Sequence, residues 1–123
     1  MAASVLIVDD DRSFHDLAAR LLAAAGLDVV ARADSAGAGL AAARGIKPDA
    51  ILVDVMLPDR DGVELACDLA GLPWGPRVLL TSVSDEIAGG AEVDRSGAVD
   101  FIPKDALGRA PLELILGGAA IRG

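Results

Sequence analysis

One apolar run interrupted by a single acid constrains this chain more than any other stretch. Residues 51–57 read Ile-Leu-Val-Asp-Val-Met-Leu, and a turn begins at Pro58 and closes at Gly62. A continuous apolar run of this length between turn residues predicts a strand buried on both faces, as in parallel sheets. A carboxylate on such a strand is costly unless it lies at the open end of the sheet, where ligands bind. Asp54 is therefore the first candidate functional residue.

The same strand pattern occurs four more times along the chain. The five predicted strands cover residues 4–8, 28–31, 51–54, 77–80 and 98–102. Between them, apolar residues recur at the 3.6-residue spacing of helices. This alternation predicts an α/β fold, a parallel sheet covered by helices on both faces. The 123 residues suit one domain, and no stretch remains that is long enough for a second.

The predicted helices begin and end at residues with capping or breaking roles. Ser35 is expected to cap the second helix, and Gly45 to stop it. Residues 84–96 form a weak helix, because Gly89 and Gly90 each cost about 1 kcal/mol relative to alanine. A short last helix is expected to begin at Pro111.

Four other residues read as structural. Asp11 is expected to cap the first helix, and Leu17 lies on the predicted apolar face of that helix. His15 is expected on the surface, because the chain has no second histidine to share a metal. Cys67 reads as a small residue packed within the third helix, and a single cysteine forms no internal disulfide.

Composition limits the partners and the compartment. The formal net charge of −8 disfavours nucleic-acid binding by this domain, because such binding needs clustered cations. No apolar run approaches the length that crosses a membrane, and the start Met-Ala-Ala-Ser has no basic segment before a hydrophobic one. Together with the single cysteine, these features predict a cytoplasmic protein.

Polar residues follow four of the five predicted strands. The carboxyl ends of parallel strands share one edge of the sheet, so the groups at this edge would be Asp9, Asp10, Asp54, Thr81 and Lys104. Clustered carboxylates repel one another, and a hard divalent cation such as Mg²⁺ relieves that repulsion. A hydroxyl and an ammonium group beside them suit phosphoryl oxygens, which indicates phosphoryl transfer to a carboxylate.

These residues belong to four motifs that run in order along the whole chain. The motifs are Val8-Asp9-Asp10, residues 53–58 with Gly62, Leu80-Thr81-Ser82, and Gly97-Ala98 followed by residues 101–104. Each motif alone is weak, but together they resemble the receiver domain of two-component response regulators. The resemblance implies a flavodoxin-like, doubly wound, five-stranded sheet of order 2-1-3-4-5, and one receiver domain over residues 1–123.

The resemblance also implies roles for the acidic cluster. Asp54 would accept the phosphoryl group and also contact Mg²⁺. Asp10 would bind the metal directly, and Asp9 would act largely through water. The backbone carbonyl of Met56 would be a further metal ligand.

On the same basis, Thr81 is the switch hydroxyl, Lys104 the phosphate-binding lysine and Phe101 the aromatic residue that turns on activation. The positions two after the phosphoacceptor and two after the switch hydroxyl flank the approach of the hydrolytic water in this family. Here they are Met56 and Val83, which are both apolar.

The implied phosphodonor is a sensor histidine kinase or a histidine phosphotransfer protein. A second copy of the chain could bind the face formed by the fourth helix, fifth strand and fifth helix. Such a domain assists its own phosphorylation and dephosphorylation but is otherwise no enzyme. One departure is that the family commonly has a cis proline after the lysine, whereas Asp105 follows Lys104 here. A trans bond is expected, because a non-proline cis bond costs about 2.5–4 kcal/mol.

Two alternative functions stay open at this point. A receiver fold can act as a binding module without phosphorylation; the altered lysine loop favours this reading, whereas the intact set of acids, hydroxyl and lysine opposes it. An aspartate-nucleophile phosphatase of the haloacid dehalogenase type would need a second aspartate two residues after the nucleophile. Met56 occupies that position, which makes the phosphatase a weak alternative.

Overall fold

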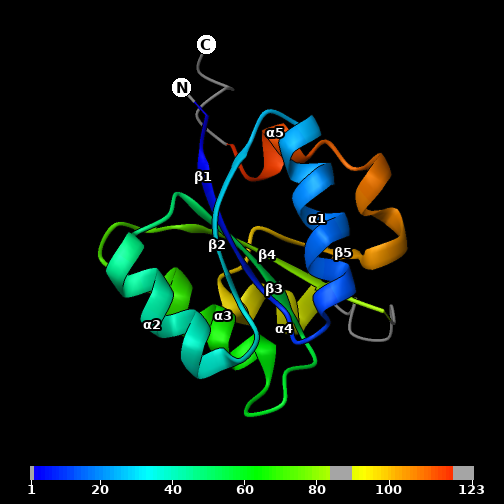
Figure 1. The fold of residues 1–123 in the computed structure, drawn as a ribbon. Coiled ribbons are helices and arrows are strands. Elements are labelled where there is room, and N and C mark those ends of the chain that lie inside the picture. Colours follow the sequence, from blue (N-terminus) through cyan, green and yellow to red (C-terminus); the bar gives the residue numbers. More distant parts are fainter. Residues whose placement is uncertain (1, 84–89, 118–123) are drawn as a thin grey trace.

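The structure is a computed structural model that describes residues 2–83 and 90–117 (Figure 1). Its five strands all pair in parallel, in the order β2-β1-β3-β4-β5. They are β1 (Ser4–Val8), β2 (Asp28–Ala33), β3 (Ala50–Asp54), β4 (Arg77–Ser82) and β5 (Asp100–Pro103). The doubly wound sheet and its strand order are therefore confirmed.

Helices connect the strands and differ in part from the prediction. They are α1 (Arg12–Ala24), α2 (Ala36–Ile46), α3 (Gly62–Ala70), α4 (Gly90–Ser96), α5 (Leu112–Ile115) and the 3-10 helix η1 (Lys104–Arg109). Gly45 does not stop α2, which ends one residue later, and Lys47 follows in a left-handed conformation. The sequence pattern did not predict η1. Of the weak helix predicted over 84–96, residues 84–89 lie outside the described part of the chain.

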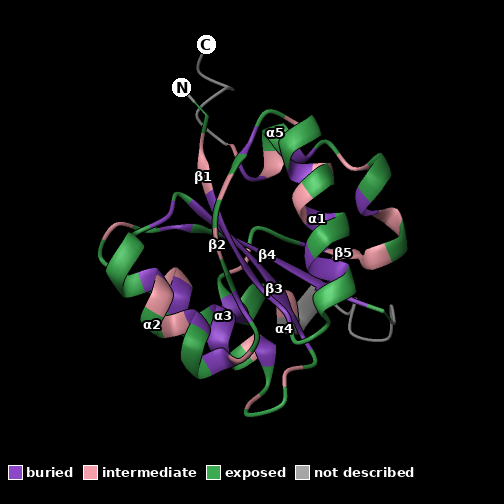
Figure 2. Ribbon diagram, viewed as in Figure 1, coloured by how far each residue is buried: buried purple, intermediate pink, exposed green. Residues whose placement is uncertain are grey.

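The central strands are buried along most of their length (Figure 2). Alternate residues along them belong to two apolar layers. One layer lies between the sheet and α2 and α3, and the other lies between the sheet and α1, η1 and α5. The residues that β1, β3 and β4 contribute to the first layer are Leu6, Val8, Ile51, Val53, Val78 and Leu80, and those that they contribute to the second are Val5, Ile7, Ala50, Leu52 and Leu79. Because both faces are covered, the central strands are continuous apolar runs.

Helix α2 approaches β1 closely, which explains why a glycine lies inside it. A Cβ atom on Gly39 would lie 2.8 Å from Cγ2 of Val8. Ser35 caps the helix as predicted, since its hydroxyl accepts from the N–H of Ala38 at 3.1 Å. Packing against the sheet therefore compensates for the poor helix propensity of this segment.

The predicted environments of three helical side chains were wrong. His15 is buried, whereas Leu17 is 41% exposed, because α1 turns Phe14 and Ala18 toward the sheet. Cys67 is exposed, since α3 buries Leu65, Ala66 and Leu69 instead. The predicted cap of α1 is confirmed: the Asp11 carboxylate accepts from the N–H groups of Ser13 and Phe14.

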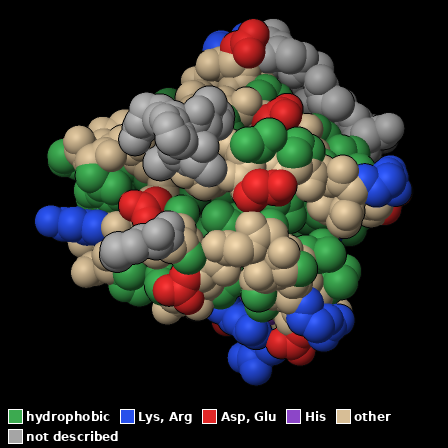
Figure 3. All heavy atoms as spheres, turned by 90° about the horizontal axis from the view of Figure 1, so that it is seen from above, with side chains coloured by type: hydrophobic (Ala, Val, Ile, Leu, Met, Phe, Trp, Pro, Cys, Tyr) green, Lys and Arg blue, Asp and Glu red, His purple; other side chains and the backbone are tan. Residues whose placement is uncertain are grey.

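Charged side chains are spread over the face that Figure 3 shows. Acidic side chains lie singly among hydrophobic and neutral ones, while Lys and Arg lie toward the margins of this view. No helix in the described residues is long and apolar enough to span a membrane.

Candidate functional site

The register of the sheet brings the predicted polar residues to one edge. Asp54, the last residue of β3, lies directly opposite Thr81 of β4. Val8 and Val53 are neighbours on β1 and β3, so Asp9 leaves β1 beside Asp54. Lys104 follows directly after β5. The parallel topology alone therefore assembles acids, hydroxyl and ammonium at the carboxyl end of the sheet.

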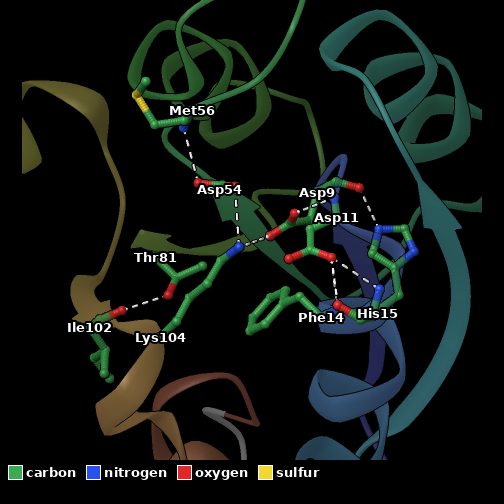
Figure 4. A network of polar contacts seen from close by, with 10 residues as sticks. Asp9, Asp11, Phe14, His15, Asp54, Met56, Thr81, Ile102 and Lys104 are labelled. Carbon is green, nitrogen blue, oxygen red and sulfur yellow. Dashed lines mark hydrogen bonds and ion pairs between the residues drawn. The ribbon is translucent and has the colours of Figure 1, made fainter. Parts of the chain in front are cut away.

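Asp9 is fully buried and fixed at nearly every polar atom. Its N–H donates to the carbonyl of Ala33 at 3.0 Å, and its Oδ1 accepts from the N–H of Asp11 at 2.8 Å. Its own carbonyl oxygen contacts Nε2 of His15 (Figure 4). Asp9 Oδ2 is the exception: it lies 2.8 Å from Lys104 Nζ, an ion-pair distance, but it lacks a hydrogen bond of suitable angle.

Lys104 lies at the centre of the cluster. Besides Asp9, its Nζ lies 3.4 Å from Oδ2 of Asp54, and its side chain is only 12% exposed (Figure 4). The peptide bond to Asp105 is trans, as expected. The ammonium group also lies over the ring of Phe14, 4.1 Å from the ring centroid.

Burial makes Asp54 a weaker acid than usual. Burial raises the pKa of the Asp54 carboxyl to about 6, and the nearby Asp9 charge adds to the rise, while the Met56 N–H and Lys104 oppose it. Burial lowers the pKa of Lys104, but its contacts with Asp9 and Asp54 outweigh that effect and raise the pKa overall. At neutral pH both groups are charged, so Asp54 is available as a nucleophile.

This raised pKa predicts how stability depends on pH without a metal. Because the pKa of Asp54 is higher in the folded than in the unfolded state, protonation of this carboxyl stabilises the fold. This contribution is complete below the unfolded pKa of 3.8 and is lost as pH rises through the folded pKa of about 6. In EDTA at pH 8, Asp54→Asn is expected to be more stable than wild type. Two pKa units correspond to about 3 kcal/mol, which solvent screening at this open edge lowers to about 1–2 kcal/mol.

Urea unfolding of both proteins at pH 8, 6 and 4 measures this difference. It is expected to shrink through pH 6 and to disappear near pH 4. A difference that does not change with pH, or a more stable wild type at pH 8, would contradict the burial argument.

The acidic cluster fits a divalent cation. Asp9, Asp10 and Asp54 each offer a carboxylate oxygen, and these atoms lie within 4.8 Å of one another. Asp9 Oδ2, which forms an ion pair with Lys104, adds a buried acceptor, and hard cations such as Mg²⁺ prefer oxygen donors of this kind. Met56 donates its N–H to Oδ1 of Asp54 at 3.0 Å, and the metal-binding role of its carbonyl stays a prediction.

The two predicted switch residues both point into the protein. The buried Thr81 donates its hydroxyl to the carbonyl of Ile102 at 2.7 Å, toward β5 and not toward Asp54 (Figure 4). Phe101 is 9% exposed and packs in the layer that α2 and α3 cover. Their roles in switching stay predictions.

Sequence reasoning missed one contact that holds the loop after Asp54. The Asp59 carboxylate accepts from the N–H groups of Ala36 and Gly37, at 2.8 and 2.9 Å, and so caps α2 from another loop. The hydrogen bond from Gly37, and to a smaller extent that from Ala36, holds the pKa of Asp59 below its usual value. No local pattern could reveal it, because 22 or 23 residues separate the partners.

The fold and the site together define a class of protein, a flavodoxin-like α/β domain with an acidic cluster and a lysine at the carboxyl edge of its sheet. Comparison with known families makes the assignment specific: the response regulator receiver domain matches residues 5–114. The chain belongs to this family.

Individual relatives agree with that assignment. The chain is 35% identical over 106 residues to the DNA-binding response regulator MtrA of Mycobacterium tuberculosis, covering 85% of this chain but 45% of the relative. It is 37% identical to a protein-glutamate methylesterase/protein-glutamine glutaminase of Anaeromyxobacter dehalogenans over 81% of this chain and 29% of that protein. The chain thus spans less than half the length of these curated relatives.

Solved structures of similar length give the same result. The signal receiver domain of the putative response regulator NarL from Mycobacterium tuberculosis matches with a TM-score of 0.84 and 29% identity, over 97% of both chains. A CheY-like receiver domain protein from Methanospirillum hungatei matches over the full length of both chains, with a TM-score of 0.82 and 28% identity.

Proposed function

We propose that this chain is a phosphorelay receiver that accepts a phosphoryl group on Asp54. The observation that carries the proposal is the ammonium of Lys104, which lies 2.8 Å from Asp9 and 3.4 Å from Asp54 at the open edge of the sheet. That edge combines a buried carboxylate, an acidic cluster suited to Mg²⁺ and a fixed positive charge. The phosphodonor would be a sensor histidine kinase or a histidine phosphotransfer protein.

In the proposed reaction, an oxygen of the ionised Asp54 carboxylate attacks the phosphorus of a phosphohistidine. The new P–O bond forms as the P–N bond breaks, and the electron pair of that bond returns to the donor imidazole. Lys104 stabilises negative charge on the phosphoryl oxygens. Asp9, Asp10 and Asp54 would hold Mg²⁺, which supplies further positive charge to the same oxygens.

The signal would leave the site through Thr81. To reach a phosphoryl oxygen, its hydroxyl must give up the hydrogen bond to Ile102, which opens space for Phe101 to turn. The face of α4, β5 and α5 would then change and bind a partner or a second copy of the chain. DNA binding is a property named for the longer MtrA relative, and the output of the present protein follows from what this face recognises.

The proposal predicts metal-dependent modification at one residue. With Mg²⁺ and acetyl phosphate, the intact mass should rise by one phosphoryl group, and Asp54→Asn should abolish the increase because it removes the nucleophile. Asp68→Asn is the matched control, since that exposed aspartate forms an ion pair with Arg60 on the surface and should leave modification unchanged.

Complete modification of Asp54→Asn would refute the site assignment. Small donors do not phosphorylate every receiver, so an unmodified wild type is tested next for beryllofluoride binding in the presence of Mg²⁺. If beryllofluoride shifts no amide resonance near Asp54, the alternative of a binding module without phosphorylation replaces this proposal.

A further inference from the structure

The contact between Lys104 and Phe14 takes no part in the proposed phosphoryl transfer. Phe14 lies in the first turn of α1, and its backbone N–H is one of the groups that the Asp11 cap accepts. Its ring is 5% exposed and packs in the same apolar layer as Leu107 of η1. Phe14 thus bridges the acidic β1–α1 loop and the segment that begins at Lys104.

The ammonium of Lys104 is held from two sides. Asp9 and Asp54 attract it on one side, and the face of the Phe14 ring lies 4.1 Å away on the other (Figure 4). A cation over an aromatic face within about 6 Å is attracted by the negative face of the ring. The attraction is stronger where water is excluded, and here the lysine side chain is only 12% exposed.

We propose that Phe14 is a positioning residue that holds the Lys104 ammonium against Asp9 until a metal ion binds there. The Lys104 ammonium and a metal ion at Asp9 would compete for the same carboxylate. Metal binding must therefore first displace the ammonium from the Phe14 ring. The inference rests on the proposed function, because it assumes that Asp9, Asp10 and Asp54 bind Mg²⁺. It assigns Phe14 a role in setting the affinity of this site.

A double-mutant cycle on Mg²⁺ binding tests the proposal. Phe14→Leu keeps an apolar side chain but removes the ring, and Lys104→Met removes the charge. Phe14→Leu is expected to tighten Mg²⁺ binding about two- to fivefold, the equivalent of a partly exposed cation–π contact, because the lysine leaves Asp9 more easily. In the Lys104→Met background, the same substitution is expected to leave the affinity unchanged. Affinities are measured from amide chemical shifts during Mg²⁺ titration.

The direction of the change separates this role from plain core packing. If Phe14 only supported the fold, its loss would loosen the acidic loop and weaken Mg²⁺ binding. Leu22→Val is the matched control: Leu22 lies in the same apolar layer, and this variant should lower the melting temperature without changing the affinity. Weaker Mg²⁺ binding in Phe14→Leu overturns the proposal. So does an equal change in Mg²⁺ affinity in the wild-type and Lys104→Met backgrounds.

A second readout does not depend on measuring the Mg²⁺ affinity. The chain has two lysines, Lys104 and the exposed Lys47, which serves as an internal reference. The ring current of Phe14 should move the ε-methylene protons of Lys104 upfield of those of Lys47 in metal-free protein, and saturating Mg²⁺ should reverse the shift. Equal resonances in metal-free protein overturn the proposal. If wild type binds no Mg²⁺, the proposed function fails with it; if it binds Mg²⁺ without coupling, only the role of Phe14 fails.

Discussion

Replacing Gly62 with alanine is expected to destabilise the protein by about 3 kcal/mol or more. A Cβ atom at this position would lie 2.1 Å from the backbone oxygen of Asp54 and 2.7 Å from Cα of Val55. Asp54 ends β3 and Val55 follows it directly, and this backbone cannot move aside because β3 is paired on both sides. The start of α3 must therefore separate from β3, and the hydrogen bond from the Gly62 N–H to the Val55 carbonyl is lost with it.

Urea unfolding gives the size of this effect, and Gly45→Ala is the matched control. Gly45 lies within α2 and has open space where a Cβ atom would be, so alanine there should stabilise the protein by about 0.5–1 kcal/mol. If the free energy of unfolding of Gly62→Ala lies within 1 kcal/mol of the wild-type value, the end of β3 is free to shift. The carboxylate of Asp54 would then be less firmly placed than the packing indicates.

Most of the fold could be predicted because every strand has a strong local signal. The runs at 4–8, 51–54 and 77–80 are apolar on both faces, and that pattern has few interpretations other than a central parallel strand. The strand order is a different matter: the alternation of elements allowed it, and only the resemblance to receiver domains specified it.

The main residues of the site were predictable for a topological reason. Asp9, Asp54 and Lys104 each follow or end a strand, and Thr81 lies one residue before the end of β4. In a parallel sheet such residues meet at one edge whatever the helices do. Their exact contacts were not predictable. The ion pair of Lys104 with Asp9 depends on the path of η1, and a single copy of the sequence carries no signal for that path.

The errors in the helices come from rotation about the helix axis. Successive residues in a helix differ in direction by about 100°, so a small rotation exchanges the environments of neighbouring positions. Leu17 is hydrophobic enough for a buried position. The buried face of α1, however, contains Phe14, His15 and Ala18. The His15 ring is accommodated there because its Nε2 meets the carbonyl of Asp9, a tertiary contact that hydropathy cannot reveal.

A phosphorylated form of this protein is expected to hydrolyse slowly. Hydrolysis needs a water molecule held in line with the Asp54 acyl phosphate, and the resemblance to receiver domains implies that Met56 and Val83 flank this approach. Both are largely exposed, at 68% and 82%. The Val83 side chain has no hydrogen-bonding group, and the Met56 thioether is only a weak acceptor. The Met56 side chain extends away from the Asp54 carboxylate, toward which only its N–H points (Figure 4).

Installing polar groups at both positions should shorten the lifetime of the phosphorylated form. Met56→Asn with Val83→Glu is expected to speed decay about 10- to 100-fold, because an oriented water with a proton acceptor beside it typically gains that much or more. The protein is phosphorylated with acetyl phosphate, the donor is removed, and loss of the added mass is followed with time. Met56→Leu with Val83→Ile is the matched control, which keeps the positions apolar and should decay at the wild-type rate.

Both positions are already exposed, so neither pair of substitutions disturbs the core, and a change in the decay rate reports on the path of the water. Equal decay of the polar pair and wild type would mean that the approach to Asp54 is controlled from elsewhere.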